Sequence, residues 1–307
     1  MTDNSIVKVY KKIDAKPGVM IAGWPGMGNV AIETVDYIRK KLGAEKIAEV
    51  RLDPMATLDS VVVEDGVASF PPFPHNTFYY IPDPNLVLFV GEAQLPGKMG
   101  IGLMHAVLEY AKRLGVKKVI TGAAFPMPVS CKETPRVYAA ATKKPLIDMM
   151  RRFGVRPMED GHISGLNGLV LGFAREKSMD ALCLLSTMPQ YAIGLPNPKA
   201  VWAIIEVLRK ALGFKIGFQE LEDEIRDMEE KMVSVEEKIG PALTVELKDE
   251  GDSQTGEKKV PSYITQKIER LFKETESDKT KASILKKELD RWDLYKFYED
   301  RFLDLFK

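Results

Sequence analysis

The chain has 307 residues, of which 45% are hydrophobic and 29% charged, so it is long enough to bury a large core and to form about two domains. Lys and Arg together number 44, as do Asp and Glu, and this zero net charge argues against general binding to nucleic acid or to anionic lipid. Cys131 and Cys183 lie too far apart for a CxxC motif and the three histidines show no HxxxH spacing, which argues against a zinc site and a disulfide framework. No apolar run approaches the roughly 20 residues that span a bilayer. We therefore expect a cytoplasmic protein without a metal or cofactor and without a membrane partner.

Residues 1–213 predict an α/β body with a mostly parallel sheet and flanking helices, because short aliphatic runs alternate with longer runs of helical period. We predict strands at residues 19–22, 47–52, 60–64, 77–81, 86–90, 118–122, 168–174 and 181–186. We predict helices at residues 29–41, 99–114, 145–153 and 198–212. Asp65-Gly66 lies between two apolar runs and predicts a hairpin over residues 60–81, inserted in the sheet.

The composition changes near Gly213, and 42 of the charged residues fall in residues 214–307. Apolar residues then alternate in spacings of four and three, which predicts a coiled-coil-like helix that Gly240-Pro241 ends. They are Phe214, Phe218, Leu221, Ile225, Met228, Met232, Val235 and Ile239. Residues 241–260 predict a mobile connector, and a second apolar stripe from Pro261 onward completes a helical hairpin that extends from the body. The predicted domains are thus residues 1–213 and 214–307.

Three glycines follow the first predicted strand, in the string Gly23-Trp24-Pro25-Gly26-Met27-Gly28-Asn29. Such a turn packs a helix closely on a sheet, or it presents backbone N–H groups to a phosphate. Asn29-Val30 stands where a P-loop has Lys-Ser/Thr, so ATP hydrolysis is not expected here. The string also fits GxGxxA, with Glu49 or Asp53 near the position that binds ribose. Both readings, structural turn and nucleotide loop, stay open.

Polar residues follow other predicted strands at the edge where parallel sheets form ligand crevices. Glu92 and Gln94 follow one strand, residues 130–132 another, and residues 186–191 the last. The candidate crevice consists of Gly23, Gly26, Gly28, Asn29, Glu92 and Gln94. We assign no catalytic residue, because Cys131 lacks an evident base and a lone helical histidine such as His105 is usually a packing residue.

These motifs together resemble the proteasome assembly chaperone 2 family, in its archaeal and bacterial branch. The resemblance covers about residues 6–213 and rests on GWPGMGNVA, GEAQLP, Gly122, MPQY and PNPKA in that order. It implies an α/β fold similar to nucleoside phosphorylases, self-association as a homo-oligomer, and no common catalysis. This chain has Ser186-Thr187-Met188-Pro189 where relatives often have an acidic residue before Thr-Pro, which weakens the case for chemistry in the crevice.

The resemblance also draws attention to the last three residues, Leu305, Phe306 and Lys307. Archaeal members of the family can end in a hydrophobic-Tyr-X peptide that binds between proteasome α-subunits, and here Phe replaces Tyr. The alternative is that these residues complete an amphipathic helix. The leading hypothesis is a non-enzymatic proteasome assembly chaperone or adaptor that contacts α-subunits, and the alternative is a small-molecule or nucleotide-binding enzyme or sensor that uses the glycine loop.

Overall fold

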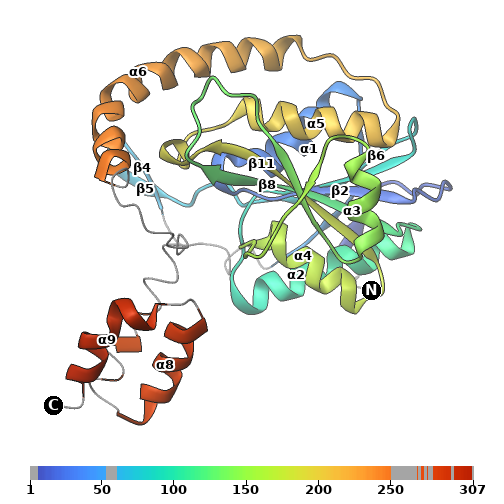
Figure 1. Ribbon diagram of the computed structural model, residues 1–307. Coiled ribbons are helices and arrows are strands. Elements are labelled where there is room, and N and C mark those ends of the chain that lie inside the picture. Colours follow the sequence, from blue (N-terminus) through green and yellow to red (C-terminus); the bar gives the residue numbers. More distant parts are fainter. Residues whose placement is uncertain are drawn as a thin grey trace. The chain divides into compact units, whose positions relative to one another are not determined.

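The structure, a computed structural model, describes residues 6–52 and 61–249, and in the C-terminal part residues 268, 271, 272, 275, 279–291 and 294–305. The chain divides into two compact units, Met1–Pro241 and Ala242–Lys307 (Figure 1). Each unit has hydrophobic core residues of its own. None of the helices in the described ranges is long and apolar enough to cross a membrane.

The described part of the first unit is built on a nine-stranded sheet in the order β1-β3-β6-β7-β2-β8-β11-β9-β10. The strands are β1 (Val7–Val9), β2 (Val19–Gly23), β3 (Glu45–Val50), β6 (Asn76–Ile81), β7 (Leu86–Gly91), β8 (Lys118–Met127), β9 (Val137–Ala141), β10 (Arg156–Pro157) and β11 (Asp180–Pro189). The four central strands, β7, β2, β8 and β11, run parallel to one another, while β6 and β9 pair with them antiparallel on either side. The predicted α/β class with a mostly parallel central sheet is confirmed.

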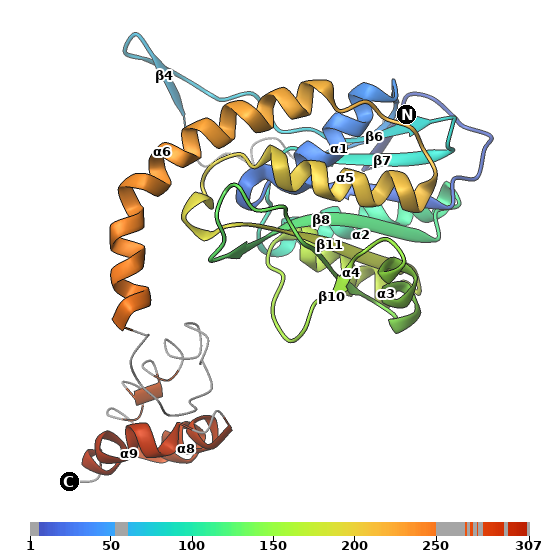
Figure 2. The same ribbon diagram turned by 45° about the horizontal axis from the view of Figure 1, so that its top comes forward.

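Helices cover both faces of this sheet (Figures 1 and 2). One face packs on α1 (Val30–Lys41) and α5 (Pro198–Leu212), and the other on α2 (Gly97–Arg113) and α4 (Leu166–Glu176). Successive residues of a strand point to opposite faces, so Ile21 enters the core under α1 and α5 while Met20 and Ala22 enter the other core. A further helix, α3 (Lys144–Arg151), packs against β9 and β10.

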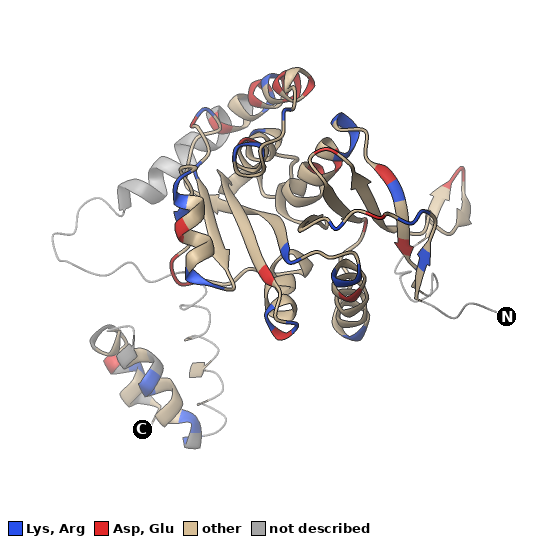
Figure 3. Ribbon diagram, turned by 90° about the vertical axis from the view of Figure 1, so that its right-hand side faces the viewer, with Lys and Arg blue, Asp and Glu red and all other residues tan. Residues whose placement is uncertain are grey.

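The central strands carry no charged residue beyond their first positions, since both of their faces are buried. Figure 3 shows charged residues on the helices and at strand ends, while the central strands are uncharged along their length. Nearly continuous apolar runs therefore identified these strands correctly in the sequence, and each of the four predicted helices is confirmed.

The prediction of a strand over residues 168–174 is wrong, because these residues lie in α4. Leu166, Val170 and Ala174 recur at a helical spacing of four and are all buried. That period is hidden in the sequence by the continuous apolar run. Strands β1, β9 and β10 were not predicted; β9 is rich in alanine, which has little preference for strands.

The predicted turn at Asp65-Gly66 is confirmed, and both residues have positive φ, 49° and 81°. It joins β4 (Val62–Glu64) to β5 (Val67–Ser69). The two strands form a separate two-stranded sheet, so the hairpin is not inserted in the central sheet as predicted. All six strand residues are exposed.

The apolar seam that begins at Phe214 packs on the body of its own chain. Phe214, Leu221 and Met232 are buried in the core under α5 and α1, and Phe218 lies against the rings of Tyr37 and Trp202. The first unit therefore extends to Pro241, whereas the sequence placed the boundary at residue 213. The helix that carries the seam, α6 (Gln219–Asp249), also continues through Gly240-Pro241, where the sequence predicted its end.

In the C-terminal unit, apolar residues of the second stripe form a small core. Ile268, Phe272, Leu285, Leu289, Phe302 and Leu305 are the buried members. They come in part from α8 (Ala282–Arg291) and α9 (Tyr295–Asp304). From Ala282 to Asp304 the chain thus forms two short helices, where the sequence predicted part of one long helix of the hairpin. Most of the predicted connector, residues 250–260, lies outside the described residues.

Candidate functional site

The glycine loop joins β2 to α1 and is positioned by close packing. At Gly23, an added Cβ would lie 2.5 Å from the carbonyl oxygen of Ala31, so only glycine lets α1 approach the strand this closely. Gly28 has a φ of +61°, in the left-handed region, and Asn29 follows at +52°. The loop therefore needs glycine for its backbone geometry at two of the predicted positions.

Three N–H groups of this loop donate hydrogen bonds to other atoms of the protein. Trp24 N donates to Oδ1 of Asn167 at 3.0 Å, Gly28 N to the carbonyl of Ile193 at 3.2 Å, and Asn29 N to Gly26 O at 2.9 Å. A phosphate-binding loop leaves such groups directed at the ligand. This geometry supports the structural reading of the glycine string.

Glu92 and Gln94 both follow β7, the neighbour of β2 in the sheet. Gln94 is hydrogen-bonded to the glycine loop, whereas Glu92 is hydrogen-bonded to His75. Gln94 donates to Pro25 O at 2.5 Å and accepts from Leu166 N at 2.9 Å, so it links the loop to the start of α4. Glu92 accepts from the backbone of His75, whose ring contacts Glu49. Glu49 lies on β3, which β6 and β7 separate from β2 and its glycine loop, and Asp53 lies outside the described residues.

Asn167 is the polar residue of this region that the sequence analysis missed. It is only 5% exposed, accepts from Trp24 N and from the hydroxyl of Thr121 (3.2 Å), and donates to Trp24 O at 3.0 Å. It thereby ties α4 to the first residue of the glycine loop beyond β2. Reading residues 166–174 as a helix with Asn167 on its buried face would have found it.

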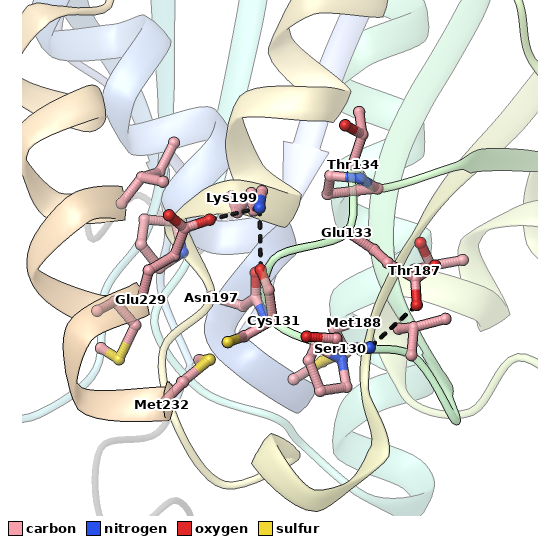
Figure 4. Close-up of a pocket in the computed structure, with 16 residues that line it drawn as sticks. Ser130, Cys131, Glu133, Thr134, Thr187, Met188, Asn197, Lys199, Glu229 and Met232 are labelled. Carbon is pink, nitrogen blue, oxygen red and sulfur yellow. Dashed lines mark hydrogen bonds and ion pairs between the residues drawn. The ribbon is translucent and has the colours of Figure 1, made fainter. Parts of the chain in front are cut away.

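A small, partly open pocket, with a cavity volume of about 20 Å³, lies at the carboxyl ends of β8 and β11 (Figure 4). Its walls come from the β8–β9 loop, the end of β11, the start of α5 and the side of α6. The polar and sulfur-bearing residues are Ser130, Cys131, Glu133, Thr134, Thr187, Met188, Asn197, Lys199, Met228, Glu229 and Met232. The structure thus brings two of the predicted segments, residues 130–132 and the end of β11, to one place, together with a helix that the sequence did not place there.

Lys199 holds two walls of this pocket together. Its Nζ donates to the carbonyl oxygens of Cys131 at 2.9 Å and Lys132 at 3.1 Å, and it pairs with Glu229 of α6 (Figure 4). With all these partners, the ammonium is a bridge between the β8–β9 loop and α6.

Glu236, about two turns further along α6, accepts hydrogen bonds from three residues. Its carboxylate accepts from Cys131 N at 2.7 Å, from the Ser130 hydroxyl at 3.0 Å and from the Tyr191 hydroxyl at 2.5 Å. Burial acts to raise the pKa of Glu236, but these hydrogen bonds outweigh it and lower the pKa below its usual value. Burial and the Glu236 carboxylate raise the pKa of the Cys131 thiol, which disfavours the nucleophilic thiolate.

The arrangement is suited to holding α6 on the body. None of the described residues that line the pocket is a histidine, and the thiol of Cys131 faces a carboxylate whose effect is to keep it protonated. His105, which the sequence assigned to packing, contacts the ring of Phe173 edge-on between α2 and α4. We therefore assign no catalytic role to these groups.

The predicted partner-binding residues are at the end of the C-terminal unit. Leu305 is 8% exposed and belongs to its core, and its carbonyl accepts a hydrogen bond from Lys279. Its side chain therefore packs within the C-terminal unit, and its role in binding a partner stays a prediction. Phe306 and Lys307 lie outside the described residues.

Comparison with known proteins places the chain among relatives of the same fold. The sequence profile of the PAC2 family matches residues 20–236. An uncharacterized protein of Methanocaldococcus jannaschii, MJ1210, is 27% identical over 240 residues, which cover 76% of this chain and 90% of that protein.

Two solved structures from Pyrococcus furiosus are similar over most of their length. PbaB, described as an archaeal proteasome activator, is 26% identical with a TM-score of 0.64, covering 75% of this chain and 98% of PbaB. PbaA, described as an archaeal homolog of proteasome-assembly chaperone, is 22% identical with a TM-score of 0.61, covering 80% of this chain and 98% of PbaA.

Proposed function

This chain belongs to the PAC2 family, and from that premise we propose that it is a non-enzymatic proteasome assembly chaperone or proteasome-binding adaptor. The similarity to PbaB, which extends over 75% of the chain at 26% identity, is the observation that carries the proposal. Three internal hydrogen bonds of the glycine loop support it, since the N–H groups of Trp24, Gly28 and Asn29 are directed at the protein and not at a ligand.

In this proposal the protein self-associates through its α/β body and contacts proteasome α-subunits with the C-terminal unit. Leu305 belongs to the core of that unit, so the contact falls to Phe306 and Lys307. A buried aromatic ring is a common anchor in a pocket of a partner protein. Several such ends on one oligomer would gain affinity through avidity.

A pulldown with isolated proteasome α-subunits tests the proposal. The intact chain is compared with a chain lacking Phe306-Lys307 and with Leu303→Asp, a matched change at a residue that is 49% exposed in the same helix. We expect the intact chain and Leu303→Asp to retain α-subunits and the truncated chain to lose most of this binding. An intact chain that retains none refutes the function. A truncated chain that binds as the parent does refutes only the role of the last residues.

The alternative, a nucleotide-binding enzyme or sensor, has a separate test. Backbone N–H groups that already donate within the protein, with no lysine in the loop, predict no tight binding of ATP or NAD. Calorimetry that showed submicromolar binding of either nucleotide, abolished by Gly28→Val, would favour the enzyme over the chaperone.

A further inference from the structure

The β4–β5 hairpin and the residues that flank it, 61–73, form an exposed apolar projection, which we call the arm. Val63 is 61% exposed, Val67 70% and Phe70 58%, and Val61 and Phe73 are also exposed. Figure 2 shows the hairpin extending away from the sheet. A two-stranded hairpin with no buried face is marginally stable by itself, and apolar patches of this kind usually mark contact surfaces.

A complementary hollow lies elsewhere on the same unit, between the first turns of α2 and α4, and we call it the groove. It has a volume of about 580 Å³, and its lining is mostly apolar. The residues are Gln94, Leu95, Pro96, Gly97, Gly100, Ile101, Gly165, Leu166, Leu169 and Phe173. Ile101 is 45% exposed and Leu169 50%, so the arm of the same chain does not cover the groove.

The charges at the two surfaces also match. The arm carries Glu64 and Asp65 at its turn. The groove lies at the N-terminal ends of α2 and α4, where the helix dipole is positive, and the exposed Lys98 is next to it in the first turn of α2. Negative side chains are favoured at such ends. An apolar projection with an acidic tip therefore fits an apolar hollow with a positive rim.

We propose that the arm of one copy of this chain docks in the groove of a second copy. The occupant is assigned from the chain itself, because it carries both halves of the complementary pair and the described residues of the first unit leave both halves exposed. Such a contact joins two different surfaces, so the first copy keeps a free groove and the second a free arm, and further copies can add to both ends until the assembly closes on itself. The inference rests on the self-association in the proposed function and adds the surfaces that make it.

Two double variants and one control test the contact by light scattering. Val63→Asp with Val67→Asp disables the arm, and Ile101→Asp with Leu169→Asp disables the groove; all four side chains are exposed, so the fold should survive, as circular dichroism would show. Ile193→Asp, at a site 42% exposed outside both surfaces, is the control. We expect the parent and the control to be oligomers and each double variant to have the mass of one chain, 34.4 kDa.

Mixing the two double variants distinguishes this contact from other interfaces. The arm variant keeps its groove and the groove variant keeps its arm, so together they can make one contact and should form a heterodimer at raised concentration. Failure to pair, or double variants that keep the parent's mass, overturns the contact but leaves proteasome binding standing, because α-subunit pulldown measures that separately. A parent that is itself monomeric overturns both the contact and the proposed self-association.

Discussion

Tyr191 donates a hydrogen bond of 2.5 Å from its hydroxyl to Oε1 of Glu236, and this contact joins the segment after β11 to a helix 45 residues further along the chain. Ser130 and Cys131 donate to the same carboxylate from a third segment. The side chain of Glu236 thus links α6 to the segments that follow β8 and β11, and it covers the carboxyl ends of these two strands. Its removal should open that edge without disturbing either sheet face.

The first prediction concerns Glu236→Ala and the thiol beneath it. Cys131 is 3% exposed, and burial and Glu236 together raise its pKa, so a thiol reagent should label it slowly in the parent. Removing the carboxylate uncovers the thiol and favours the thiolate, which should speed labelling by on the order of tenfold. Cys183 is an internal control, since burial in β11 raises its pKa to about 12 and nothing at that site changes. Equal labelling rates at Cys131 in both proteins would show that Glu236 does not hold the edge closed.

The second prediction is a pH dependence of stability at Glu49. Burial acts to raise the pKa of Glu49, but hydrogen bonds from Lys46, His75 and Tyr10 outweigh it and lower the pKa to about 2. The ionised form therefore stabilises the fold above the usual pKa of a glutamate, about 4.3, and this contribution is lost as the pH falls toward 2. Glu49→Gln should lower the free energy of unfolding by about 1 kcal/mol at neutral pH, since the partners are partly exposed.

Urea unfolding across a pH series checks this. The difference between parent and Glu49→Gln should be constant from neutral pH down to about pH 5 and should shrink below it. A difference that stays the same at acid pH would contradict the role of the ionised carboxylate.

The third prediction separates two glycines of the loop. Gly28 has a φ of +61°, and an added Cβ would lie 3.2 Å from Cβ of Asn197 and 3.3 Å from Met188. Gly28→Ala should therefore cost about 1–2 kcal/mol, the penalty for the left-handed conformation, with any crowding in addition. Gly26 is extended, with φ of −173°, and the nearest atom to its Cβ would be 3.5 Å away, so Gly26→Ala is the matched control and should change little. Thermal unfolding of the two variants measures both effects, and equal melting temperatures would refute the requirement for a left-handed residue at position 28.

The fourth prediction concerns Asn167. Asn167→Leu would leave the N–H and C=O of Trp24 and the Thr121 hydroxyl without their buried partner, at a cost of roughly 2–4 kcal/mol. Asn197→Ala removes a single helix cap, the bond that Oδ1 accepts from Ala200 N, and should cost about 1 kcal/mol. Chemical denaturation would rank the two variants. A smaller loss for Asn167→Leu than for Asn197→Ala would mean that the tie between α4 and the glycine loop contributes little.

The sequence by itself determined the α/β class, the central strands and the four helices α1, α2, α3 and α5. Apolar runs and helical periods report which residues are buried, and burial on both sheet faces makes the central strands nearly uncharged. Glycines in the sequence also indicated turns, and Gly28 and Asp65-Gly66 do have the positive φ angles of such turns.

Only the tertiary structure determined which residues each buried face packs against. The seam from Phe214 to Met232 has the period of a coiled coil, and that period is equally satisfied by the body's own core, which is where it lies. The bonds that fix the carboxyl edge join residues as far apart as Cys131 and Glu236, 105 positions along the chain, and Asn167 reaches Trp24 over 143 positions. The pattern of residues along the sequence does not indicate a partner so distant, because only the folded chain brings the two residues within hydrogen-bond range.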